Sequence, residues 1–209
     1  MVTLGAEQPL ATDAARMLSR AGRLVAIGHT RATAEQFDAV VASGARLTTH
    51  LFNAMSGLHH RSPGVAAFAL TNDAVAASLI ADGVHVHPRM LRIAFASLAP
   101  HRAVLVTDSV AWRAGSAGLV GLAMSDGAPR LADGTLAGSA CTMDIAVRTC
   151  VAAGVETHHV VRAASTNPAR LLGLTDRGAI HPGMRADLVA LDADLQVEQV
   201  WVGGVAVPL

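Results

Sequence analysis

Short apolar runs that each lead into one polar functional residue are the feature that most constrains the fold. Residues 24–27 read LVAI and lead through Gly28 to His29, and residues 103–107 read AVLVT and lead to Asp108. Continuous apolar runs of this length are typical of strands buried on both faces. Longer amphipathic stretches separate them, and this alternation predicts parallel strands covered by helices, which is an α/β fold.

The remaining elements follow the same alternation until the last part of the chain. The pattern predicts further strands at residues 46–51 and 75–81, and helices at residues 9–21, 33–43, 88–98, 139–153 and 157–165. Thr30 or Thr33 is available as the N-cap of the second helix. Residues 112–136 are rich in glycine and predict a hairpin excursion, and from residue 187 onward the strand–turn–strand pattern predicts a small antiparallel element.

Four strand-like runs end in residues that can carry chemistry: His29, His50, His85 and Asp108. The carboxyl ends of the strands of a parallel barrel meet on one face, where active sites lie. Two neutral imidazoles with carboxylates suit zinc or a similar divalent ion. An aspartate that is not a ligand can take a proton from an attacking water and pass it to a leaving amine. The alternative is four hydrogen-bonded structural residues, and the pattern alone leaves both interpretations open.

His59, His60 and Arg61 form a polar cluster in a loop. The cluster is either a solvated loop or a phosphate clamp, because arginine offers a two-pronged donor to phosphate oxygens. The other histidines predict no function and are expected at helix ends, in turns or on the surface: His87, His101, His158, His159 and His181.

Charge and cysteine content exclude several function classes. The chain has 16 basic and 16 acidic residues, and every basic residue is arginine. Zero net charge predicts neither a nucleic-acid nor a membrane partner, and the absence of lysine excludes Schiff-base and phosphate-loop lysine chemistry. The spacing of Cys141 and Cys150 predicts free thiols in a reducing cytoplasm. No uncharged apolar run reaches the roughly 18 residues of a membrane span.

Six motifs, taken in order, resemble N-acetylglucosamine-6-phosphate deacetylase, a metal-dependent barrel enzyme of the amidohydrolase superfamily. They are GHTRAT (28–33), THLFNAM (49–55), RSPG (61–64), ADGVHV (81–86), LVTDS (105–109) and DGTLAGS (133–139). The tail, NPARLLGL with GAIHPGMRADLVALD, is similar to the C-terminal signature of the superfamily. The resemblance covers essentially all 209 residues.

The resemblance implies a role for each matching residue. His29 and His50 match the histidine metal ligands, Asp108 the catalytic general base and then general acid, and His85 a histidine that polarises the acetyl carbonyl. Substrate contacts are implied at Asn53 and Ala54, at the phosphate-binding Arg61, and in a covering loop formed by Leu136, Ala137 and Gly138.

The resemblance also implies a fold, a cofactor and a partner. Residues 1–186 are expected to form part of a (β/α)8 barrel of the TIM type, about strands 4–8, and residues 187–209 the C-terminal strands of a small composite β domain. The implied cofactor is a divalent metal, zinc first, with iron, manganese and cobalt as alternatives. The intact enzyme is expected to be a homodimer in which Arg61 reaches the neighbouring site. The family's first strands, with the HLEGP-like segment whose glutamate completes the metal site, have no counterpart here.

The expected reaction is hydrolysis of N-acetylglucosamine 6-phosphate to glucosamine 6-phosphate and acetate. Two alternatives remain open. The chain is a truncated, catalytically incomplete remnant with weak metal or phosphosugar binding, or it is a related amidohydrolase acting on another amide, such as a cyclic amide. The loop from Asn53 to Arg61 argues against the last alternative, because a phosphate clamp has no evident use there.

Overall fold

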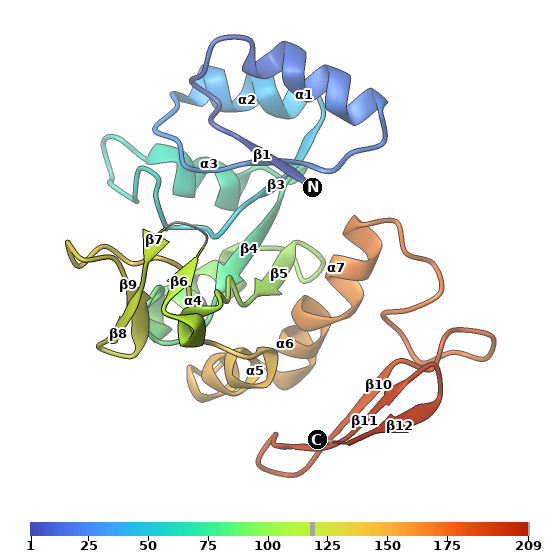
Figure 1. The fold of residues 1–209 in the computed structure, drawn as a ribbon. Coiled ribbons are helices and arrows are strands. Elements are labelled where there is room, and N and C mark those ends of the chain that lie inside the picture. Colours follow the sequence, from blue (N-terminus) through green and yellow to red (C-terminus); the bar gives the residue numbers. More distant parts are fainter. Residues whose placement is uncertain (118–119, 209) are drawn as a thin grey trace.

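The computed structural model describes residues 1–117 and 120–208, and its centre is a parallel sheet (Figure 1). Neighbouring strands in the sheet are also consecutive in the chain, with the order β1-β2-β3-β4-β5. All four pairings are parallel. The strands are β1 (Val2–Leu4), β2 (Val25–Ile27), β3 (Ala45–Thr48), β4 (Ala76–Ile80) and β5 (Ala103–Val106). The α/β class expected from the apolar runs is confirmed, and the sheet corresponds to part of a barrel.

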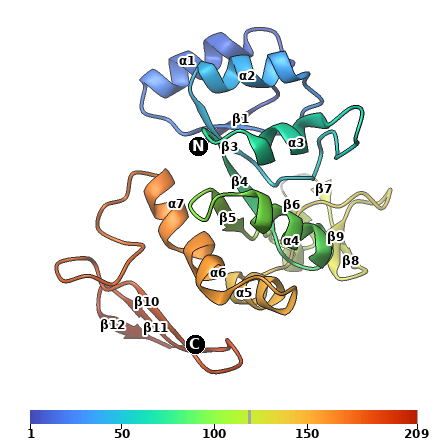
Figure 2. The ribbon, with the colours of Figure 1, turned by 180° about the vertical axis from the view of Figure 1, so that it is seen from behind.

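Helices connect the strands, and three further helices follow the last strand, β5 (Figure 2). The connecting helices are α1 (Ala11–Arg20), α2 (Ala34–Ala42), α3 (Gly64–Thr71) and α4 (Pro88–Ser97), and after β5 follow α5 (Met143–Ala152), α6 (Thr157–Ala164) and α7 (Thr166–Leu171). The last three pack against β5. No helix in the described ranges is long and apolar enough to cross a membrane.

The capping residues of two helices follow from side-chain chemistry. Thr33 is the N-cap of α2 and forms a capping box with Gln36, so of the two threonines available it is Thr33 that caps the helix. The Nδ1 atom of His87 accepts a hydrogen bond from the backbone N–H of Arg89 at the start of α4, where Pro88 occupies the first turn.

The two faces of the sheet belong to apolar clusters of different size. Val25 and Ile27 of β2 belong to the main apolar core, together with the helices, whereas Ala26 between them belongs to a second, smaller cluster. Successive strand residues point to opposite faces. The second cluster consists of Ala26, Leu47, Ala76 and Val104, with Leu24, Val106 and Leu171 packed against it. The helix-covered face therefore holds most of the core.

Two helices and the details of the excursion differ from the expectation. Helix α3 occupies residues that the sequence left without an element, and α7 extends the last predicted helix after a break at Ser165. The excursion holds two short antiparallel hairpins, one of β6 (Ser116–Ala117) with β7 (Val120–Gly121) and one of β8 (Ala123–Ser125) with β9 (Ala128–Arg130). Residues 118 and 119 of this predicted segment lie outside the described residues.

The last strands form a separate antiparallel sheet of β10 (Leu188–Leu191), β11 (Val197–Val202) and β12 (Val205–Val207), as the tail pattern predicted. It lies apart from the parallel sheet in both views (Figures 1 and 2). The turn between β10 and β11 touches the rest of the chain, because Leu195 packs against the main core and its carbonyl accepts a hydrogen bond from Arg148. Cross-strand pairing places five valines on one face of this sheet: Val189, Val200, Val202, Val205 and Val207.

Candidate metal and catalytic site

His29, His50 and Asp108 lie just beyond the carboxyl ends of β2, β3 and β5. All three have positive φ angles, at 48°, 30° and 51°. Non-glycine residues rarely adopt this left-handed backbone conformation, and such strain clusters at functional sites. A side chain at Gly28 would collide with Thr49, so the turn into His29 requires glycine. These positions are where the sequence placed the site.

The imidazoles of His29 and His50 face each other through their Nε2 atoms, which are 2.9 Å apart. Two nitrogen ligands of one tetrahedral zinc would lie about 3.3 Å apart, given Zn–N bonds of roughly 2.0–2.1 Å. The two atoms therefore lie within a few tenths of an ångström of the spacing that a shared ion requires. The Nδ1 atom of His50 is buried without a hydrogen-bond partner in the described residues. The pair fits a divalent ion.

The surroundings of His50 favour the neutral ring that a metal needs. Burial is the main cause that lowers the pKa of His50 from its ordinary value, and the neighbouring His29 lowers it further. A backbone hydrogen bond and the carboxylate of Asp108 act in the opposite direction. Asp108 follows β5 at the same end of the parallel sheet as the two histidines, which follow β2 and β3.

Thr30, which follows His29, connects three strand-end loops and was not predicted to have this role. Its side chain is buried, and its hydroxyl accepts hydrogen bonds from the N–H groups of Ala6 and Ala32, each at 3.2 Å. The same hydroxyl donates to the carboxylate of Glu7, and the Thr30 N–H donates to the carbonyl of Ala54 at 3.1 Å. Thr30 thus ties the loop of His29 to the loops after β1 and β3. The only feature of the sequence that could have indicated this role is that Thr30 follows His29 directly.

Asn53 and Ala54 lie in the loop that begins with His50. The Asn53 side chain donates to the carbonyls of His50 and Leu51, each at 3.3 Å, and its backbone N–H donates to the His50 carbonyl at 2.9 Å. Ala54 has a positive φ of 51°, and its carbonyl accepts the hydrogen bond from the Thr30 N–H. The structure therefore brings both predicted substrate residues next to the histidine pair.

The segment with Leu136, Ala137 and Gly138 returns to Asp108. The N–H of Ser139 donates to the Asp108 carbonyl at 2.8 Å. Gly138 has a φ of 88°, and a Cβ there would lie 2.9 Å from the same carbonyl oxygen. Glycine is therefore required for the close approach of this segment to the predicted catalytic residue. The predicted covering loop and Asp108 lie side by side.

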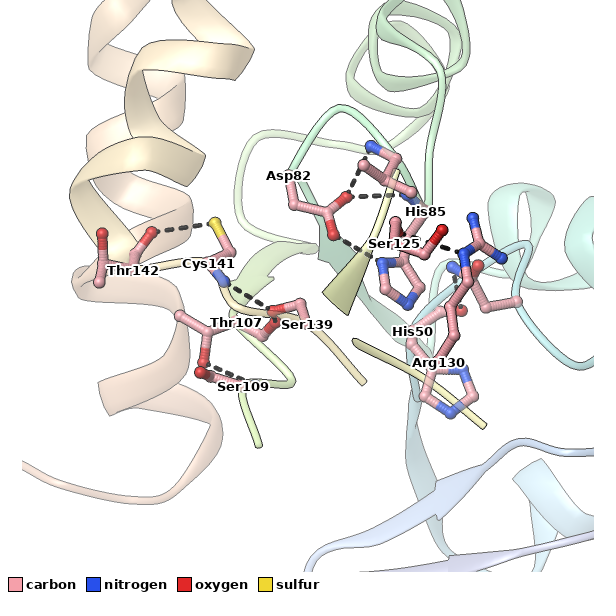
Figure 3. Close-up of polar contacts among 12 residues, drawn as sticks. His50, Asp82, His85, Thr107, Ser109, Ser125, Arg130, Ser139, Cys141 and Thr142 are labelled. Carbon is pink, nitrogen blue, oxygen red and sulfur yellow. Dashed lines mark hydrogen bonds and ion pairs between the residues drawn. The ribbon is translucent and has the colours of Figure 1, made fainter. Parts of the chain in front are cut away.

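His85 lies farther along the chain from its strand than the sequence predicted. Strand β4 ends at Ile80, so the histidine follows the strand by five residues instead of ending it. The Asp82 carboxylate holds it, with an Oδ2–Nδ1 distance of 2.6 Å, and both side chains are almost completely buried. In Figure 3 the His85 ring extends from the Asp82 carboxylate toward His50. The signal that could have found Asp82 is its spacing of three residues from His85.

Arg61 lies in the exposed loop before α3. Its Nη1 atom is 2.7 Å from Nε2 of His60, and its backbone N–H donates to Nδ1 of His59. The structure joins these three residues to one another and shows no contact between Arg61 and the histidine pair. Within the described ranges, no group of three or more histidine, cysteine or acidic side chains is placed to hold one ion.

Residues 7–207 match the model of the amidohydrolase family. The chain belongs to the amidohydrolase family. Membership implies a divalent metal, and the spacing of the facing Nε2 atoms of His29 and His50 is compatible with such an ion.

Curated relatives of this amidohydrolase are sugar-phosphate deacetylases. An N-acetylgalactosamine-6-phosphate deacetylase of Escherichia coli is 39% identical over 98% of the chain, which covers 56% of that protein. A shorter Escherichia coli protein, named as an unproven N-acetylgalactosamine-6-phosphate deacetylase, is 41% identical over 74% of the chain, and here the match covers 96% of the relative. The chain thus spans about half the length of the first relative and nearly all of the second.

A solved structure repeats the fold. The N-acetyl-D-glucosamine-6-phosphate deacetylase of Mycobacterium smegmatis, a variant in complex with N-acetyl-D-glucosamine-6-phosphate, superposes with a TM-score of 0.92 at 38% identity. The match covers 99% of this chain and 57% of that one. The resemblance read from the motifs is confirmed.

Proposed function

We propose that this chain carries most of the active site of a deacetylase that hydrolyses the acetamide of N-acetylglucosamine 6-phosphate, giving glucosamine 6-phosphate and acetate. The observation that carries the proposal is the facing pair of His29 and His50, with Asp108 after β5 at the same end of the parallel sheet. Relatives are named for both the glucosamine and the galactosamine phosphate, so the galactosamine epimer is the alternative substrate.

His29 and His50 hold the ion in this proposal, and zinc is the metal that best suits two imidazoles, with iron, manganese and cobalt as alternatives. Such an ion, when bound, polarises a carbonyl oxygen and lowers the pKa of water. Asp108 takes the proton of the attacking water at its carboxylate and then delivers that proton to the amide nitrogen as the C–N bond breaks. His85 contacts the acetyl group.

The remaining contacts serve the sugar phosphate. Arg61 binds the phosphate through its guanidinium, and in a homodimer it serves the site of the neighbouring copy. Its exposure supports this assignment, as do its hydrogen bonds, which join it to His59 and His60 and not to the histidine pair. Asn53, Ala54 and the segment 136–138 line the sugar site. In this proposal, residues 1–186 are part of the hydrolase barrel, residues 187–209 belong to a small composite β domain, and the protein works in the cytoplasm.

A second proposal is a catalytically incomplete chain with weak metal binding. The observation that favours it is the absence, within residues 1–117 and 120–208, of a third ligand beside the two histidines. Catalytic zinc ordinarily has three protein ligands.

Metal titration with an acetate-release assay separates the two proposals. The purified chain is titrated with Zn²⁺ and Co²⁺, and acetate is measured with both epimeric substrates and with unphosphorylated N-acetylglucosamine. The deacetylase proposal expects Asp108→Asn to abolish acetate release while metal binding persists, and His50→Ala to weaken both. His87→Ala, an exposed helix cap, is the matched control. Metal binding without turnover in the parent chain would establish the incomplete chain, and near-normal turnover in Asp108→Asn would overturn the deacetylase assignment.

A further inference from the structure

Among residues 1–117 and 120–208, the carboxylate of Asp82 hydrogen-bonds only to the loop that carries His85. Its Oδ1 atom accepts from the backbone N–H groups of Val84 at 2.9 Å and His85 at 2.8 Å. Its Oδ2 atom lies 2.6 Å from Nδ1 of His85. The side chains of His85 and Asp82 are only 5% and 7% exposed. A carboxylate buried this deeply is stable only when such partners replace its water.

These bonds fix the position of the ring as well as the fold of the loop. His85 lies five residues beyond β4, where a free loop would leave the side chain undirected. Two backbone bonds turn residues 82–85 back on themselves, and the third bond holds the imidazole by one nitrogen. A Cβ at Gly127, in the β8–β9 turn, would lie 3.4 Å from Val84, so the hairpin packs on the same loop.

The chemistry of the contact decides which nitrogen meets the substrate. An ionised carboxylate only accepts hydrogen bonds, so Nδ1 of His85 must carry the hydrogen that bridges to Asp82. The hydrogen bonds from His85 and Val84 hold the pKa of Asp82 below its ordinary value, although burial acts in the opposite direction. The neutral ring therefore presents Nε2 as an acceptor, and only the protonated ring presents Nε2 as a donor to a carbonyl oxygen.

We propose that Asp82 is a positioning residue that holds His85 through Nδ1, fixes the Nδ1–H tautomer and leaves Nε2 as the atom that contacts the substrate. The proposal rests on the function proposed above, in which His85 contacts the acetyl group. It adds a condition to that function. His85 polarises the acetyl oxygen in its protonated form, and in its neutral form it accepts a hydrogen bond from a substrate hydroxyl or amide.

Nitrogen-15 NMR of histidine-labelled protein tests the assignment without substrate or metal. Spectra are recorded at rising pH until the nitrogen resonances of His85 and His87 stop moving, so that both rings are observed in their neutral form. His85 is expected as the Nδ1–H tautomer. His87 is the internal control, because its Nδ1 accepts a hydrogen bond from Arg89 and its neutral ring must carry the hydrogen on Nε2. An Nε2–H tautomer at His85 in the parent protein would overturn the proposal.

Two variants extend the test. In Asp82→Asn the one remaining oxygen is needed by the backbone N–H groups of Val84 and His85, so the NH2 group faces Nδ1 as a donor. Asp82→Ala removes the acceptor altogether. Both variants are therefore expected to shift His85 toward the Nε2–H form. A retained Nδ1–H tautomer in folded Asp82→Ala would contradict the role of the carboxylate. Far-UV circular dichroism confirms that each variant is folded, and the parent spectrum alone decides the case if Asp82→Ala does not fold.

Addition of N-acetylglucosamine 6-phosphate separates this inference from the proposed function, with inorganic phosphate as the control. Movement of the His85 Nε2 resonance, with Nδ1 still bonded to Asp82, supports both. If the sugar phosphate leaves His85 unmoved while the tautomer is as expected, the substrate role of His85 fails and the positioning by Asp82 stands. If Nδ1 instead of Nε2 responds, the positioning by Asp82 is refuted.

Discussion

The parallel sheet and the C-terminal antiparallel sheet are built from similar residues but are buried very differently. All five residues of β4 and all three of β2 are buried, under helices on one face and a smaller cluster on the other. In the tail sheet the valine face is open, and Val205 is 69% exposed. Apolar sequence therefore produces stability only where a second layer covers it. The candidate metal and catalytic residues His29, His50 and Asp108 follow strands of the covered sheet.

The largest expected difference between the two sheets is in stability. Phe37 of α2 is fully buried in the main apolar core, and its ring centroid lies 5.9 Å from that of Phe68 in α3. Phe37→Ala is expected to lower the free energy of unfolding by about 3–5 kcal/mol. Val205→Ala in the tail is the matched control, with an expected change within about 0.5 kcal/mol. Urea unfolding followed by circular dichroism measures both, and equal losses would show that the valine face is covered.

A smaller loss is expected at the loop junction of the parallel sheet. Thr30→Val keeps the shape of the side chain but leaves the N–H groups of Ala6 and Ala32 and the carboxylate of Glu7 without their hydroxyl partner. The expected cost is about 1–3 kcal/mol in the free energy of unfolding. Thr30→Ser restores the hydroxyl and is the control. Urea unfolding and Co²⁺ titration are measured on both, and a Co²⁺ affinity that Thr30→Val leaves unchanged would remove the link between Thr30 and the histidine pair.

The pH dependence of stability tests the buried carboxylate of Asp82. Its hydrogen bonds with His85 and Val84 lower its pKa below the ordinary value of 3.8. A depressed pKa contributes stability that is present above that ordinary value and is lost as the pH falls through the folded-state pKa. The stability difference between the parent chain and Asp82→Asn should therefore be constant near neutral pH and shrink in acid. Urea midpoints across this range measure it, and Asp13→Asn, on the exposed face of α1, is the control.

The smallest effect is expected on the open face of the tail sheet. Val202 and Val205 are 48% and 69% exposed, so replacement of either by lysine should change the free energy of unfolding by no more than about 0.5 kcal/mol. The same replacements should reduce self-association, because they interrupt an exposed apolar patch. Light scattering against concentration measures the second effect. A stability loss above about 1 kcal/mol would mean that the face is packed in the folded chain.

Local patterns predicted the elements that depend on local interactions. The continuous apolar runs before His29 and Asp108 are buried strands, and the alternating residues of the tail form an antiparallel sheet. Both could be predicted because the order of apolar and polar residues in a strand reflects which of its faces are buried. Helix α3 escaped prediction. Its residues are almost uniformly apolar, with no polar face, and no helical period distinguishes such a segment from a strand.

The sequence by itself determined the family and the identity of the residues at the strand ends. The tertiary structure decided the contacts between them: the 2.9 Å approach of His29 to His50, the junction at Thr30, and the hold of Asp82 on His85. Each of the first two joins loops that follow different strands, so their geometry depends on how the strands pair and the helices pack. The third contact joins residues that are close in sequence. The tertiary structure buries both side chains, so the hydrogen bonds of the carboxylate must replace the water that it loses. Long-range packing, which no local pattern encodes, fixes the site.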